Sequence, residues 1–176
     1  MKIPLRAQVV IDHVKKHKWT RGVELGVLKG DTLFAVLDAC PDLHMVGVDI
    51  WMQTPEKDAR IDEGGWGYTN HDMDAHRRRV FERAKDYGKR VTLYEMPTTE
   101  AARWYDDHYF DFAFVDADHL YEAVKADLAV WVPKIRYGGM MLGHDYSPAF
   151  PGVVKAVDEV FGRPLKHPDC VWSAPC

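Results

Sequence analysis

The sequence predicts a doubly wound α/β protein, with a mostly parallel seven-stranded sheet and helices on both faces. Three observations support this fold class. Short apolar segments alternate with longer segments whose apolar residues recur at helical spacing. Two glycines, Gly26 and Gly30, follow the first apolar segment, and acidic residues follow several others. Alternating strands and helices are typical of parallel sheets whose crossover helices cover both faces.

The composition is that of one ordinary globular domain, which we expect to comprise residues 1–176. The chain is 47% hydrophobic and 28% charged, so a core of normal size can form. A net charge of −4 gives no basic excess of the kind typical of nucleic-acid binding. Three cysteines without CxxC spacing indicate neither a disulfide framework nor a zinc site. Because no long apolar run or signal peptide stands out, we expect a cytoplasmic protein without membrane contact.

The expected elements follow one another in a regular order. Residues 1–19 should provide a covering helix, because apolar residues recur at helical spacing over 5–17. The expected strands are 21–26, 45–50, 90–95, 110–116 and 140–144, with one or two short strands within 164–174. The expected helices are 30–39, 72–87, a helix capped by Thr98 or Thr99, 119–132 and 151–161.

Residues 51–70 interrupt this rhythm. The segment is rich in glycine and contains the aromatic residues Trp51, Trp66 and Tyr68. Long loops in compact domains are usually functional or disordered. We therefore expect a lid or substrate wall here, although the aromatic side chains could equally anchor the loop onto the domain.

The most informative segment is Glu24-Leu-Gly-Val-Leu-Lys-Gly30. An apolar strand, a glycine turn and a helix start together form a cradle for a nucleotide. Asp49 ends the next apolar segment, 23 residues after Gly26. An acid at about this distance is placed to accept hydrogen bonds from ribose hydroxyls. Leu28 stands where a dinucleotide fingerprint needs glycine, which disfavours NAD.

Acids and histidines also follow two later strands. Asp116 ends the fourth expected strand, and Asp145 follows the fifth. If these strands are neighbours, the two carboxylates converge and either share a proton or hold a hard divalent cation such as Mg²⁺. His119 and His144 could join as metal ligands, or one of them could act as a general base. Asp118 fits better as a helix cap.

These motifs resemble a known family. Glu24–Gly30 resembles motif I of class I S-adenosylmethionine-dependent methyltransferases, whose fold is Rossmann-like. The segment 110–124 and Gly143-His-Asp-Tyr146 resemble its type 24, catechol O-methyltransferase-like subfamily. The resemblance runs from about residue 20 to residue 162 and implies S-adenosylmethionine as cofactor. The residues that it assigns to cofactor binding are Glu24, Gly26, Gly30, Asp49, Thr98 and Asp116.

The resemblance leaves metal dependence open. Related catechol and caffeoyl-CoA O-methyltransferases hold a divalent metal with an Asp after the fourth strand and an Asp-Asn pair after the fifth. Asp116 and Asp145 match the first two positions, whereas Tyr146 stands at the third. A metal site would then need His144 or His119 as a substitute ligand.

The expected function is S-adenosylmethionine-dependent methylation of a small molecule, most simply at oxygen, with His119 or His144 as the catalytic base. Two alternatives remain. One is a cofactor-binding domain without transferase activity, and the other is a metal-dependent hydrolase that uses the acids and histidines. The resemblance is also compatible with a homodimer.

Overall fold

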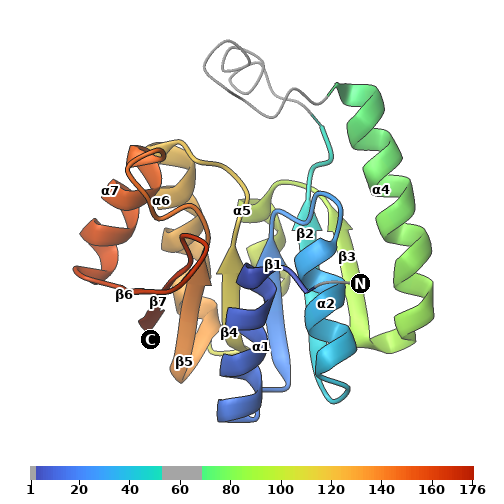
Figure 1. Cartoon of the computed structure of the whole chain (residues 1–176), viewed down its shortest axis with the longest axis horizontal. Helices are drawn as coiled ribbons and strands as arrows, with labels where there is room; N and C mark the ends of the chain where they lie inside the picture. Colours follow the sequence, from blue (N-terminus) through green and yellow to red (C-terminus); the bar gives the residue numbers. More distant parts are fainter. Residues whose placement is uncertain (1–2, 53–68) are drawn as a thin grey trace.

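The computed structural model describes residues 3–52 and 69–176 of the chain. In this part, seven strands form one sheet: β1 (Arg21–Leu25), β2 (His44–Asp49), β3 (Val91–Glu95), β4 (Phe110–Val115), β5 (Ile135–Gly143), β6 (Leu165–Lys166) and β7 (Trp172–Pro175). Their order is β3-β2-β1-β4-β5-β7-β6 (Figure 1). The first five strands pair in parallel, and the last two join as antiparallel strands. The predicted fold class is confirmed.

Helices cover both faces of the sheet. The α-helices are α1 (Leu5–His17), α2 (Asp31–Ala39), α4 (Asn70–Ala84), α5 (Thr98–Ala101), α6 (Tyr121–Trp131) and α7 (Pro151–Phe161). Within the described residues, 3₁₀ turns also occur at η2 (Lys85–Arg90), η3 (Ala102–Trp104) and η4 (Val132–Lys134). The helices α1, α2 and α4 pack on one face, and α5, α6 and α7 pack on the other (Figure 1).

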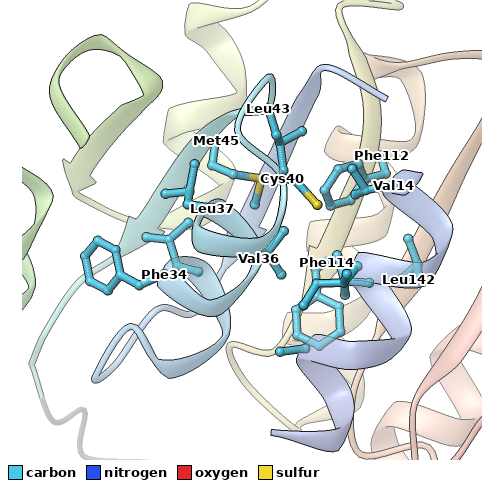
Figure 2. Close-up of a cluster of buried hydrophobic side chains, with 14 of the residues drawn as sticks. Val14, Phe34, Val36, Leu37, Cys40, Leu43, Met45, Phe112, Phe114 and Leu142 are labelled. Atoms are coloured by element: carbon cyan, nitrogen blue, oxygen red, sulfur yellow. The ribbon is translucent and has the colours of Figure 1, made fainter. Parts of the chain in front are cut away.

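Two apolar cores result, one on each side of the sheet. Figure 2 shows the first core, which contains Val14, Phe34 and Leu37 from the helices and Phe112 and Phe114 from β4. The neighbouring β4 residues 113 and 115 belong to the second core. Successive side chains of a strand point to opposite faces. This central strand therefore contributes apolar side chains to both cores.

Some boundaries differ from the predicted ones. The strand expected at 140–144 begins at Ile135 and runs through Gly138, whose φ is +75°. The pairing between β4 and β5 shifts register at this place, which indicates a bulge. Gly138 therefore lies within the strand, at the bulge, rather than before the strand begins.

The cap predicted for the helix after β3 is also wrong. Pro97 occupies the N-cap position of α5, and Thr98 and Thr99 lie inside the helix. The hydroxyl of Thr98 instead donates to Asp127 of α6, 2.5 Å away. The side chain of Thr98 therefore forms a tertiary hydrogen bond to Asp127 instead of capping its own helix.

Most of the expected lid, residues 53–68, lies outside the described residues, and so do Trp66 and Tyr68. Trp51 is described and buried, and its indole donates to the carbonyl of Leu28. For Trp51, anchoring onto the domain is therefore confirmed. No helix within residues 3–52 and 69–176 has the length and apolar character needed to span a bilayer.

Candidate active site at the carboxyl edge of the sheet

The carboxyl ends of β1, β2, β4 and β5 lie along one edge of the sheet, as parallel pairing requires. Val115 stands opposite Gly143 in the register of β4 and β5. The amide of His144 donates to the carbonyl of Val115 at 3.0 Å, and the amide of Asp116 donates to Leu25 at 2.8 Å. These bonds continue the sheet past its last paired residues. The predicted meeting of the loops after β4 and β5 is confirmed.

The turn after β1 needs its two glycines for backbone reasons. Gly26 has φ +87°, and a Cβ there would lie 2.2 Å from the carbonyl oxygen of Asp116. Gly30 has φ +76°, and a Cβ there would lie 2.5 Å from the ring of Phe34. Both φ values lie in the left-handed region that side chains disfavour. The glycines therefore allow β1 to approach β4 and α2 to begin close behind the turn.

Asp49 holds this turn in place. One carboxylate oxygen accepts the amides of Val27 and Leu28, both at 2.8 Å. The other accepts the amide of Trp51 at 2.7 Å. Leu28 has φ +48°, an unusual value for a residue with a branched side chain. The three hydrogen bonds fix both loops, so Asp49 has a structural role that the sequence did not reveal.

Glu24 is the most buried acid near this edge, with 2% of its surface exposed. Its Oε2 atom has no hydrogen-bond partner among the described residues. Burial, followed by the charge of Asp116, raises the pKa of Glu24 well above its ordinary value. Burial also raises the pKa of Asp116 to about 7. Two buried acids of this kind favour a positively charged ligand, because a cation would stabilise both ionised forms.

Asp145 lies between two histidines. The Nε2 atom of His119 is 2.8 Å from one of its oxygens, and Nδ1 of His144 is 3.1 Å from the other. Burial alone would raise the pKa of Asp145, but the hydrogen bonds from both histidines hold the pKa well below its ordinary value. The pKa of His144 is raised, because Asp145 and Asp116 outweigh the effect of its burial.

The same cluster has the residue types and the close spacing that a cation site needs. Single ligand atoms of Asp116, His144 and Asp145 lie within 4.8 Å of one another. Tyr146 does not complete this set, because its hydroxyl donates to Asp158 at 2.5 Å. A hollow of about 10 Å³ lies between the side chains, with Val115 and Trp172 in its wall. This volume suits one water molecule or one ion.

Two residues of the site were not predicted, and they come from opposite ends of the chain. Arg6 of α1 donates through Nε to the hydroxyl of Thr32 at 2.9 Å, and the same Nε is 3.7 Å from Asp116. The amide of Arg6 donates to Asp169, whose carboxylate is 3.7 Å from Nε2 of His144. No sequence motif marks either residue, because 163 positions separate them.

Thr98 is the predicted site residue that stands apart from this cluster. Its hydroxyl donates to Asp127, and its carbonyl accepts from the indole of Trp131 at 3.1 Å. Both partners belong to α6. The side chain of Thr98 therefore connects α5 to α6, while the loop before it still follows the end of β3.

Comparisons with known proteins agree with this geometry. A family profile described as a methyltransferase domain of type 24 matches residues 23–146, which is more than half of the chain. The matched range contains the glycine turn, Asp49, Asp116 and Asp145. A comparison with curated proteins gives no significant match.

Solved structures show the same fold at low sequence identity. A Staphylococcus aureus protein provisionally assigned as a caffeoyl-CoA O-methyltransferase has a TM-score of 0.69 and 12% identity, with 100% of this chain and 85% of that chain covered. A Podospora anserina methyltransferase bound to S-adenosylhomocysteine has a TM-score of 0.66 and 18% identity, with 98% and 78% covered. The O-methyltransferase NovP has a TM-score of 0.65 and 18% identity, with 97% and 77% covered.

The doubly wound sheet, with a glycine turn after β1 and acids at the ends of β2, β4 and β5, defines a class I methyltransferase. The chain belongs to the type 24 family of S-adenosylmethionine-dependent methyltransferases. Its sequence-based assignment to that family is confirmed.

Proposed function

We propose that the protein transfers the methyl group of S-adenosylmethionine to an oxygen atom of a small molecule. The buried carboxyl of Glu24 beside Asp116, with Oε2 lacking a partner among the described residues, carries this proposal. A buried acid without a partner is costly, and a cationic ligand removes that cost. The cofactor has an ammonium group at its amino-acid end and a positively charged sulfur that supplies an activated methyl group.

Each end of the cofactor has a candidate binding group in the chain. Glu24 and Asp116 would bind the ammonium group, and the turn from Gly26 to Gly30 would lie along the amino-acid chain. Asp49 would accept a hydrogen bond from the ribose with the lone pairs that its three backbone donors leave. Because the hydroxyl of Thr98 is already engaged, we propose that only the main chain before it approaches the adenine.

His119 is the better of the two candidate bases. Nδ1 of His144 meets Asp145 at 3.1 Å and its Nε2 atom is buried, so neither ring nitrogen is open to an acceptor hydroxyl. His119 meets Asp145 through Nε2, and this contact would leave Nδ1 free to take the proton of an acceptor hydroxyl. The ring of His119 also packs against Phe150 at 4.5 Å, which fixes its plane. We assign His119 as the base and His144 as the group that positions Asp145.

A second candidate mechanism uses a divalent cation at Asp116, Asp145 and His144, because their ligand atoms converge. Mg²⁺ or a related ion there would lower the pKa of an acceptor hydroxyl, so that the hydroxyl would need a weaker base to lose its proton. Two carboxylates and one imidazole also suit softer divalent ions than Mg²⁺. A metal-dependent hydrolase would use the same cluster but would not need the cofactor-binding turn after β1.

The choice of oxygen as acceptor rests on support from similar structures. Two of them are described as O-methyltransferases, one of these provisionally as acting on caffeoyl-CoA. A small-molecule acceptor agrees with the absence of a basic excess in the sequence. A cytoplasmic location, a single domain over residues 1–176 and a homodimer are further parts of this proposal.

Isothermal titration with S-adenosylmethionine, S-adenosylhomocysteine and Mg²⁺ separates the readings. The proposed function requires binding of both adenosyl ligands, followed by transfer of labelled methyl groups to a hydroxylated small molecule. Cofactor binding without transfer to any acceptor pool would favour the non-catalytic domain. Binding of Mg²⁺ with no affinity for either adenosyl ligand would favour the hydrolase.

The variant Asp145→Asn tests the assignment of the base. Asp145 has φ +60°, a conformation that asparagine also tolerates, so the backbone should persist. With an acceptor in hand, we expect kcat to fall by about 10²- to 10⁴-fold, since His119 loses its anionic partner. Cofactor affinity should remain. The exposed Asp106 gives the matched control Asp106→Asn, and an equal loss of kcat in both variants would remove Asp145 from the mechanism.

A further inference from the structure

Arg6 brings a guanidinium group to the acidic edge of the sheet. It lies in the first turn of α1, and about 30% of its side chain is exposed. Its Nε atom donates to the buried hydroxyl of Thr32 at 2.9 Å, which fixes the direction of the group. The two terminal nitrogens make no hydrogen bond to the residues that the structure describes. An anchored guanidinium therefore presents both terminal nitrogens for another partner.

Asp116 does not fill that place. Its carboxylate is 3.7 Å from Nε of Arg6, beyond hydrogen-bond distance, and this contact uses the nitrogen that already serves Thr32. Terminal nitrogens of arginine match the two oxygens of a carboxylate in a paired geometry. Asp116 therefore pairs with Arg6 by charge at Nε alone, and the two terminal nitrogens are suited to a planar anion.

We propose that Arg6 forms a binding site for the carboxylate at the amino-acid end of the cofactor, with Thr32 holding the guanidinium in place. The proposal rests on the proposed function, since it names a further contact of the same ligand. Glu24 and Asp116 face the ammonium group, and Arg6 faces the carboxylate. The two charges of one amino acid then meet opposite charges on β1, on the loop after β4 and on α1.

This arrangement makes the chain selective for an intact amino acid. Glu24 and Asp116 favour any adenosyl ligand that carries an amine. Arg6 favours only ligands that also carry a carboxylate. A decarboxylated analogue keeps its adenosine and amine contacts but leaves Arg6 without a partner, so it should bind less tightly.

The experiment compares two ligands on two proteins by isothermal titration. The ligands are S-adenosylhomocysteine and its decarboxylated analogue, which lacks only the carboxylate. For the wild-type protein we expect S-adenosylhomocysteine to bind about 10- to 100-fold more tightly, as expected for a charged hydrogen-bonded pair. In Arg6→Gln this preference should disappear, because affinity for S-adenosylhomocysteine falls and affinity for the analogue does not.

Two further variants sharpen the result. Arg6→Lys keeps the positive charge but lacks the paired terminal nitrogens of arginine. It should therefore keep only part of the preference for S-adenosylhomocysteine. Arg21→Gln removes a cation from the first residue of β1, at the opposite end of that strand, and should keep the full preference. Thermal unfolding of each variant shows whether it is folded.

The outcomes separate this proposal from the proposed function. If Arg6→Gln weakens both ligands equally, Arg6 acts through structure or general charge and the proposal is wrong. If it leaves the affinity for S-adenosylhomocysteine unchanged, the proposal is also wrong, while the methyltransferase function stands. If the wild-type protein binds neither ligand, the proposed function itself fails and the carboxylate site fails with it.

Discussion

Single residues at this site serve the backbone as well as the ligand. The sequence marked Asp49 as a ribose acid, and the structure adds three amides that its carboxylate accepts. Gly26 was expected to leave room for a ligand, but a Cβ there would first meet the carbonyl of Asp116. Both residues therefore shape the backbone of the turn even without a cofactor. The residues of motif I therefore determine the backbone conformation of the turn as well as its binding surface.

The variant Asp49→Asn should therefore change stability and affinity together. In asparagine an NH₂ group replaces one carboxylate oxygen. This group cannot accept a hydrogen bond from a backbone amide, so at least one of the three hydrogen bonds is lost. We expect the free energy of unfolding to fall by about 1 to 3 kcal/mol, with weaker binding of S-adenosylhomocysteine. Urea denaturation and calorimetry measure the two effects. The exposed residue Asp42, which lies just before β2, supplies the control Asp42→Asn, for which neither quantity should change.

At the scale of elements, α1 does more than cover the sheet. Its first turn places Arg6 at the site, and its last turns join a ring cluster with the C-terminal segment. His13 lies 5.4 Å from the ring of His167 and 6.0 Å from those of His17 and Trp19. Burial lowers the pKa of His13, and the charges of His167 and His17 lower it further. The helix and the C-terminal segment therefore meet at His13, whose lowered pKa disfavours its protonated form.

This cluster predicts a pH-dependent contribution to stability. The pKa of His13 is below 6.5 in the folded state, so the unfolded chain takes up the proton first as the pH falls. The contribution of His13 is thus present above pH 6.5 and is lost as the pH falls toward its folded pKa. The measurement is urea denaturation of the wild type and His13→Gln at pH 7.5 and pH 5.5. The difference in unfolding free energy between the two proteins should rise with pH.

A matched control isolates this effect from other titrating groups. Asp116 and His144 have raised pKa values and act in the opposite direction, but both proteins contain them. The exposed His44 provides the variant His44→Gln, which should follow the wild type at both pH values. If His13→Gln also runs parallel to the wild type, the ring cluster has no role in acid sensitivity.

At the scale of the whole molecule, the C-terminal segment completes the sheet next to the site. β7 pairs with β5 in antiparallel fashion, and it places the fully buried Trp172 beside Gly143. A Cβ at position 143 would lie 2.5 Å from the indole. Trp172 also lines the small hollow between the acids and histidines. The end of the chain thus supports the loop that carries His144 and Asp145.

Two tryptophans allow a direct comparison of these positions. Trp172→Ala should lower the free energy of unfolding by about 3 to 5 kcal/mol, because a large buried side chain is lost. Trp104, which is 70% exposed, should tolerate the same change within about 0.5 kcal/mol. Urea denaturation monitored by circular dichroism measures the free energy of unfolding of both variants. Equal effects would mean that β7 contributes little to the core.

The sequence by itself determined the order of strands and helices, the glycine turn and the acids at strand ends. Local patterns carry this information, because strand periodicity, glycine conformation and parallel pairing follow from nearby residues. From them follows the meeting of Asp116 and Asp145, given that the strands before them are neighbours.

Only the tertiary structure decided which partners those residues meet. It placed Arg6 and Asp169 at the site, paired His119 with Asp145 and directed Thr98 to Asp127. These contacts join distant segments through space, and no local pattern encodes their geometry. The charge balance of the pocket, with buried acids on the strands and one arginine from α1, exists only once the chain has folded.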